Sequence, residues 1–392
     1  MVLVAVSCLA ASALAAQGRK PPPLDSLRAQ AARDSLDPAA HHRLSVGYWR
    51  AKRYDEEARA LRRAIELDPR YAPAYYSLGL QVYDRRPKLL EEEDKGKVPP
   101  AWRDSLVQSA RLRRQAFLID PMVDLRVIGT EAPPEDLLVL PEYGELTTYW
   151  LLDIALGSFG TARYELSYAA WAKFVERMYA GKPEDSIPSF VFWYRGLAAA
   201  HRDIHNRAIA DFKVLLARAQ ARERSDSLIQ VPLETNDFRY ILAVLHERAR
   251  RPADAEALYK EALANDLGLF MAHVRLAGMY RTYRQWNDAV TEARRAIEAN
   301  PDDPVAVREL GEILYDARRP AEAEPVLHQA LERLPTDTRT HYLLGVLYQE
   351  TDRPALAREA LSRFVALAPA ARVTGPAVED AKQRLQALPA GP

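Results

Sequence analysis

Histidine residues are the first side chains in this sequence whose spacing suggests chemistry. His201 and His205 stand four residues apart, so a helix would place both imidazoles on one face. Imidazole nitrogens bind zinc well, but a zinc site needs at least three protein ligands, and no third ligand accompanies this pair. We therefore favour a polar turn over a metal site at this point, and we interpret the adjacent pair His41-His42 in the same way.

Two further segments contain fragments of catalytic patterns. The triplet His201-Arg202-Asp203 matches part of a protein-kinase catalytic loop, but neither an Asp-Phe-Gly sequence nor a nucleotide loop accompanies it. The segment 157–160, Gly-Ser-Phe-Gly, has neither the spacing nor the lysine of a phosphate-binding loop. We therefore expect no catalytic residue, no metal site and no cofactor, and we expect that the protein is not an enzyme.

Charge composition narrows the class of partner. The chain has 54 Lys and Arg residues and 54 Asp and Glu residues, so its formal net charge is zero. A nucleic-acid-binding protein normally has a basic surface, and attachment to anionic lipids needs a run of basic residues. Neither feature is present, so we expect no nucleic acid partner.

The N-terminus predicts export. Residues 2–16 form an apolar run that is too short to span a bilayer, and the segment 13–15, Ala-Leu-Ala, supplies the small residues that a signal peptidase reads. We expect a bacterial signal peptide over 1–16, a mature chain without a transmembrane span, and a periplasmic or extracellular location with possible peripheral association with the envelope. The alternatives are lipidation of Cys8, which is the only cysteine, and a retained anchor.

A sequence period organises the C-terminal half of the chain. Four consecutive segments repeat with a 34-residue step: 236–269, 270–303, 304–337 and 338–371. Each has a large apolar residue at position 7, Ala or Gly at position 8 and Ala at position 20. Small residues let two helices approach closely, and the proline near the end of most segments stops a helix interior.

This step and pattern resemble the tetratricopeptide repeat family. The resemblance implies an all-α fold, a right-handed α-solenoid of stacked antiparallel helix pairs. Proteins of this kind grow along one dimension, so the usual estimate of domain number from chain length does not apply.

The other boundaries follow from how well each segment keeps the pattern. In chain order, we expect a signal peptide (1–16), an N-terminal linker or cap (17–37), N-terminal repeat units of which one has an insertion (38–121), an irregular insertion (122–149), degenerate repeat-like units (150–222), a linker (223–235), four regular repeats (236–371), and a C-terminal capping helix and tail (372–392).

The resemblance also implies which residues face the concave groove, because the family lines it with fixed positions of the first helix of each repeat. Those positions here hold Tyr76, Tyr83, Trp193, Tyr240, Arg281, Arg308, Glu312, Tyr315, Arg339 and Tyr342. Tyrosine, tryptophan and arginine are the residue types that dominate binding hot spots, and an arginine can pair with a carboxylate through two hydrogen bonds. The alternative for each tyrosine is a place in the core between repeats.

The sequence therefore predicts a scaffold or adaptor that binds a peptide or helix of another protein in its groove. Two alternatives stay open. The chain could be a structural subunit of an envelope assembly, or a ligand-binding or enzymatic module in which segment 122–149 closes a pocket near Trp150 and Trp193.

Overall fold

The computed structural model describes residues 22–84, 100–123, 144–224 and 233–389. Within these ranges all regular elements are helices, and successive helices pack as antiparallel pairs joined by short turns. The predicted all-α fold of stacked helix pairs is confirmed. The predicted signal peptide at 1–16 and most of the predicted irregular segment at 122–149 lie outside the described residues.

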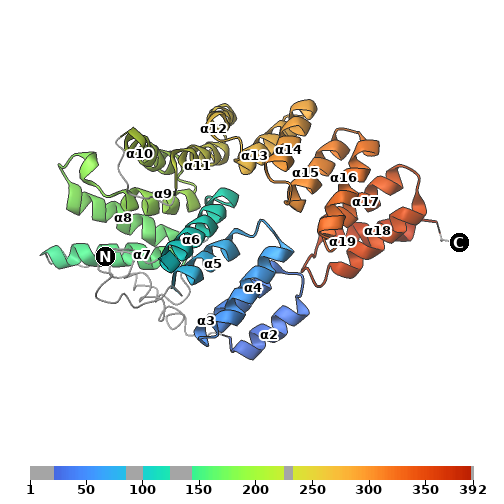
Figure 1. The fold of residues 1–392 in the computed structure, drawn as a ribbon, viewed down its shortest axis with the longest axis horizontal. Helices are drawn as coiled ribbons and strands as arrows, with labels where there is room; N and C mark the ends of the chain where they lie inside the picture. The colour runs from blue at the N-terminus through green and yellow to red at the C-terminus, as the bar shows by residue number, and fades with distance from the viewer. Residues whose placement is uncertain (1–21, 85–99, 124–143, 225–232, 390–392) are drawn as a thin grey trace. The chain divides into compact units, whose positions relative to one another are not determined.

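The helices form two compact units. The central unit comprises residues 82–262, and the terminal unit is built from both ends of the chain, residues 23–81 and 263–392 (Figure 1). The central unit contains α6 (Pro100–Ile119), α7 (Gly144–Gly160), α8 (Tyr164–Tyr179), the 3-10 helix Glu184–Ser186, α9 (Ser189–His201), α10 (His205–Arg224), α11 (Thr235–Arg248) and most of α12 (Pro252–Asn265).

The terminal unit contains helices from both ends of the sequence. Its N-terminal part holds α2 (Leu24–Arg33), α3 (Pro38–Arg50), α4 (Tyr54–Leu67) and most of α5 (Ala72–Asp84). Its C-terminal part holds α13 (Phe270–Thr282), α14 (Trp286–Ala299), α15 (Pro304–Asp316), α16 (Pro320–Arg333), α17 (Thr338–Glu350), α18 (Pro354–Leu367) and α19 (Pro376–Ala387).

Aspartate residues cap the N-termini of three helices, each of which is the first helix of its repeat. The side chains of Asp37, Asp303 and Asp337 accept hydrogen bonds from backbone N–H groups in the first turns of α3, α15 and α17. Such a cap satisfies a donor that has no partner within the helix. Asp303 and Asp337 are one 34-residue step apart, so the sequence period also sets the helix starts.

The turn between the two helices of each repeat has a left-handed residue. The φ angles are positive at Arg250, Arg284, Arg318 and Asp352, which follow one another at 34-residue intervals. Since residues with a Cβ rarely adopt this conformation, the recurrence shows that one backbone turn is repeated without a glycine. Proline begins the second helix after three of these turns, at Pro252, Pro320 and Pro354.

Small residues lie where the paired helices touch. Ala289, Ala323 and Ala357, which occupy position 20, are each 0% exposed. A Cβ added at Gly311 would lie 2.5 Å from Cδ2 of Leu327, which is itself 0% exposed. The small residues of the sequence pattern therefore lie where the two helices of a repeat are too close together for a larger side chain.

Some predicted boundaries differ from the structure. Segment 17–37 contains a full helix, α2, which packs on α3. The prediction of irregular structure at 122–149 is wrong over its last residues, because α7 begins at Gly144. The prolines of that segment end at Pro141, so nothing after it interrupts the hydrogen bonds of a helix.

We expect Gly311→Val to lower the free energy of unfolding by about 2 kcal/mol, because overpacking a tight core contact costs about 1–3 kcal/mol. Gly278→Val is the matched control, since a Cβ at Gly278 meets nothing within 4 Å. Urea denaturation of both variants measures the difference. Equal stability of the two variants would contradict a steric limit at Gly311.

Candidate functional site

The predicted polar turn between His201 and His205 is confirmed. Helix α9 ends at His201 and α10 begins at His205, so the two imidazoles do not share a helix face. The ring of His201 stacks on Tyr164, with centroids 3.8 Å apart and planes 1° apart. Among the described residues no group of three or more His, Cys, Asp or Glu side chains is placed to hold a metal ion.

The pair His41-His42 also has separate structural contacts. Nε2 of His41 lies 3.1 Å from the carbonyl oxygen of Ser35, and Nε2 of His42 lies 2.9 Å from the hydroxyl of Ser77. The two rings therefore hold different elements of the terminal unit, the turn before α3 and helix α5. They do not converge on a common ligand position.

The predicted groove residues of the central unit mostly lie in its core. Tyr240 is 0% exposed and packs against Tyr259, so its assignment as a partner contact is wrong. Trp193 is half-buried, with its ring centroid 5.0 Å from that of Phe117 and 6.5 Å from that of Phe238. Both aromatic side chains bury their area between helices of the central unit, as the alternative interpretation predicted for the tyrosines.

The two tyrosines predicted on α5 give less information. Tyr76 is half-buried. Tyr83 lies near the end of the helix, and its side chain is outside the described residues. Neither residue belongs to the cluster that follows.

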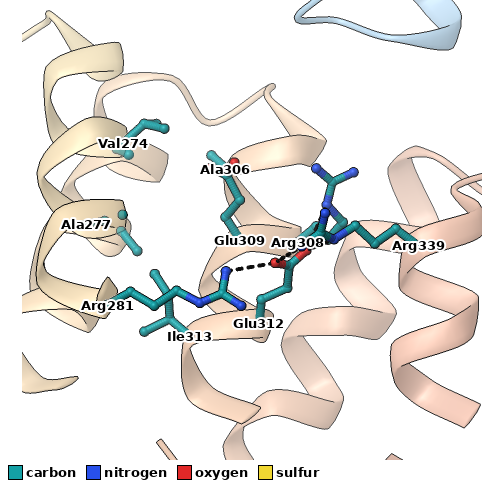
Figure 2. Close-up of a pocket in the computed structure, with 12 residues that line it drawn as sticks. Val274, Ala277, Arg281, Ala306, Arg308, Glu309, Glu312, Ile313 and Arg339 are labelled. Carbon is teal, nitrogen blue, oxygen red and sulfur yellow. Dashed lines mark hydrogen bonds and ion pairs between the residues drawn. The ribbon is translucent and has the colours of Figure 1, made fainter. Parts of the chain in front are cut away.

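Four predicted residues of the terminal unit meet in one cluster. Glu312 on α15 is 2% exposed, and three guanidinium groups surround its carboxylate. Nη1 of Arg281 donates to Oε2 at 2.9 Å, and Nη2 of Arg339 donates to the same oxygen at 2.8 Å (Figure 2). Nε of Arg339 lies 2.6 Å from Oε1, and Nε of Arg308 lies 3.4 Å from it. Helices α13, α15 and α17 thus each supply part of the cluster.

Two further carboxylates hold the outer sides of these arginines. Asp316 accepts from Nε of Arg281 at 2.6 Å, and Asp337 accepts from Nη1 of Arg308 at 3.2 Å. A carboxylate as deeply buried as Glu312 needs such cationic partners to remain charged. The aspartates in turn hold the guanidinium groups of Arg281 and Arg308 from the side away from Glu312.

A cavity of about 150 Å³ borders this cluster. We call it the Glu312 cavity. It is lined by Val274, Ala277, Gly278, Arg281, Ala293, Ala296, Ala306, Arg308, Glu309, Glu312, Ile313 and Arg339 (Figure 2). Helices α13, α14 and α15 contribute apolar side chains, and helices α13, α15 and α17 contribute the charged ones. The lining of the cavity therefore combines apolar side chains with guanidinium and carboxylate groups.

The two remaining predicted tyrosines, Tyr315 on α15 and Tyr342 on α17, each donate a hydrogen bond to a carboxylate. The hydroxyl of Tyr315 donates to Oε1 of Glu350 at 2.7 Å, and that of Tyr342 donates to Oδ2 of Asp380 at 2.7 Å. Burial, together with the bond to Glu350, raises the pKa of Tyr315 to about 12. Both hydroxyls thus have acceptors within the repeats, and the ring of Tyr342 packs against that of Phe364, with centroids 5.3 Å apart.

Sequence reasoning missed three residues next to this cluster. Arg70 donates from Nε to Asp303 at 2.9 Å and from Nη1 to both carboxylate oxygens of Glu309 at 2.9 and 3.0 Å. Glu309 also lines the Glu312 cavity. The residues that meet are 233 and 239 positions apart, and a repeat pattern describes only contacts between neighbouring units, so no signal in the sequence pointed to this contact.

Comparison with known protein families identifies the repeats. Family models described as "Tetratricopeptide repeat" match residues 218–268 and 280–338 and, in a second model, residues 314–375. No curated protein matches the chain. Among the described residues no helix has both the length and the apolar character needed to cross a membrane.

Several solved structures are similar in fold. The C-terminal part of a repeat-containing protein from Cytophaga hutchinsonii is 12% identical, with a TM-score of 0.44 over 60% of this chain and 94% of that one. A tetratricopeptide repeat protein from Parabacteroides merdae is 12% identical, with a TM-score of 0.40 over 80% of this chain and 97% of that one. YrrB, described as having an unusual peptide-binding site, is 18% identical, with a TM-score of 0.36 over 54% and 98% of the two chains. These likenesses carry no conclusion about the function of this chain.

We expect Glu312→Gln to lower the free energy of unfolding by about 3 kcal/mol, because removing one partner of a buried ion pair leaves the other charges uncompensated. Thermal or urea unfolding measures the change. Glu332→Gln on α16 is the control, since Glu332 is exposed and such a substitution changes stability by less than about 0.5 kcal/mol. A loss no larger than that of the control would contradict a structural role for Glu312.

The ionisation of Tyr315 provides a second test. Its pKa is raised from 10.0 to about 12, so the stability that its neutral hydroxyl contributes is complete below pH 10 and is lost as the pH rises toward 12. We expect the phenolate absorbance change near pH 12 to be smaller in Tyr315→Phe by the contribution of one tyrosine, because Tyr75 also ionises near pH 12 and remains. In Glu350→Gln the contribution of Tyr315 should move to lower pH, because the negative charge beside the hydroxyl is gone. If Tyr315→Phe instead lost absorbance change near pH 10 and kept all of it near pH 12, the assignment would be wrong.

Proposed function

We propose that this chain, a tetratricopeptide repeat protein, holds a segment of another protein in the Glu312 cavity and along the adjoining faces of α13, α15 and α17. Repeats of this family generally form non-catalytic scaffolds for protein interaction. The proposal adds which face of this chain is used and what chemistry its partner presents.

The convergence of three arginines on one buried carboxylate carries the proposal. Each guanidinium has five N–H donors, and the bonds to Glu312, Asp316 and Asp337 use only part of them. The side chain of Arg339 is 59% exposed, although its Nε lies only 2.6 Å from Glu312. A guanidinium fixed on one side and open on the other is already oriented, so a ligand loses less entropy in binding it.

The partner chemistry that fits is a carboxylate next to an apolar side chain. The carboxylate would accept bonds from the outer N–H groups of Arg339 and Arg281, and charge-assisted bonds of this type are among the strongest available. The apolar side chain would lie against the small residues of α13 and α14. An aspartate, a glutamate or a C-terminal carboxylate in an extended segment supplies both features.

The two alternatives from the sequence have no additional support in the described residues. The ligand-binding or enzymatic alternative uses segment 122–149, of which 124–143 lie outside these residues. Export and envelope association depend on residues 1–16, which lie outside them too, and both stay predictions.

Selection of random peptides on the folded chain tests the proposal. We expect the selected peptides to be enriched in Asp, Glu or a free C-terminus, and to bind Arg339→Ala about tenfold or more weakly than the unaltered chain. The loss of one hydrogen bond to a charged group, about 1.5–3 kcal/mol, gives this factor. Isothermal titration calorimetry measures the affinities.

Arg333→Ala is the matched control. Arg333 is an exposed arginine in the last turn of α16, so its removal changes the net charge by the same amount at a site away from the cavity. Equal weakening by both variants would indicate attraction to net charge alone. Full affinity of the selected peptides for Arg339→Ala would exclude the Glu312 cavity as the binding surface.

A further inference from the structure

The N-terminal helices of the terminal unit touch its C-terminal repeats at two separate places. The first place is the guanidinium of Arg70, in the turn after α4, which lies between Asp303 and Glu309 of the C-terminal array. At the second place the N–H of Leu36 donates to the carbonyl oxygen of Ala370 at 3.1 Å. Arg372 strengthens that contact, at 3.9 Å from both Asp34 and Asp37.

These contacts are made by polar groups, whereas the N-terminal helices have an apolar core of their own. Leu27, Ala31, Leu44 and Ala60 form a buried cluster, and the partly buried side chains that pack on it, Leu24 and Tyr48, also come from α2 and α3. The cluster draws no member from the C-terminal array. The N-terminal helices can therefore keep their packing if they separate from the C-terminal repeats.

Charge dominates the contact at Arg70. The side chains of Arg70 and Asp303 are 12% and 3% exposed, and that of Glu309 is 33% exposed. Burial raises the pKa of the neighbouring Asp68, and burial together with Asp303 and Asp68 raises the pKa of Tyr75 to about 12. The ion pairs of Arg70 thus lie beside other polar side chains whose burial costs free energy.

This contact is incompletely satisfied. Nη2 of Arg70 is buried and has no hydrogen-bond partner among the described residues. A buried ion pair contributes little net stability, because the loss of hydration offsets most of the attraction. The contact therefore specifies how the two parts meet and adds little to the free energy of folding.

Glu309 connects the contact to the proposed binding surface, because it binds Arg70 and also lines the Glu312 cavity next to Arg308. We propose that Arg70 is an intramolecular latch: it holds helices α2–α4 against α15 and neutralises Glu309 at the edge of the Glu312 cavity. The effect of the latch on the cavity rests on the proposed function, whereas the latch itself does not.

Distance measurements between spin labels test the latch directly. Labels at Arg59→Cys on α4 and Glu298→Cys on α14, both exposed positions, report on the separation of the two parts once Cys8, the one native cysteine, is replaced by serine. We expect one narrow distance distribution for the otherwise unaltered chain. Arg70→Glu should broaden it and shift it to longer distances, and Arg70→Glu with Glu309→Arg should restore it.

Arg62→Glu is the matched control, because Arg62 is exposed on α4 and its replacement makes the same change in charge. Circular dichroism verifies that each variant is folded, and Glu309→Gln gives a milder weakening of the same contact. A narrow, unshifted distribution in Arg70→Glu would overturn the latch. A distance distribution that stays broad in Arg70→Glu with Glu309→Arg would overturn it too.

The effect on the cavity has its own readout. Loss of Arg70 leaves the negative charge of Glu309 without its cation at the cavity edge, so Arg70→Glu should bind the selected acidic peptides more weakly than Arg62→Glu does. Equal affinity of these two variants would overturn this effect and leave the latch standing. The distance measurement needs no ligand, so its failure is distinct from a failure of the peptide selection.

Discussion

The close approach of the two helices in each repeat is the constraint on which the rest of the structure depends. Helix pairs can pack at this distance only where one side chain is absent or is a methyl group, as at Gly311 and Ala323. The turn between the helices must then reverse the chain within a few residues. In each repeat of the C-terminal array it does so through one left-handed residue, and that residue is never glycine. Steric fit between helices therefore outweighs the local backbone preference.

Regular stacking of these pairs also builds the charged cluster. Arg281, Arg308 and Arg339 belong to three successive repeats, and the common 34-residue step brings them to the one carboxylate of Glu312. A buried carboxylate with three guanidinium partners is a polar network inside a largely apolar stack. Such a network specifies one register of the helices, because a shifted register would leave charges buried and unpaired.

The sequence predicted the parts of the molecule that depend on short-range rules. The repeat step, the small residues at Ala289, Ala323 and Ala357 and the helix class all follow from contacts within one unit or between neighbours. Arg281, Arg308, Glu312 and Arg339 were also singled out from the sequence, as positions that the resemblance assigns to the groove. The ion pairs among these residues were not predicted. A position within a repeat indicates which face of the helix a residue lies on, but it does not indicate which charged residue it pairs with.

The failures have physical reasons as well. Tyr240 occupies a position that the resemblance assigns to the groove, yet it is fully buried against Tyr259, which lies on the second helix of the same repeat. Arg70 lies in a turn whose sequence, Asp-Pro-Arg-Tyr, is ordinary for a repeat boundary. Its partners come from the other end of the chain, and periodicity contains no information about such a contact.

The origin of the terminal unit in both chain ends has a consequence for biosynthesis. Residues 23–81 leave the ribosome long before residues 263–392 exist, so the first repeats wait through the synthesis of the entire central unit for the surface that they contact. Closing so long a loop costs little more entropy than closing a shorter one, but the contact forms late because its residues are distant in sequence. The separate apolar core of α2, α3 and α4 lets this nascent segment keep its own packing during that interval.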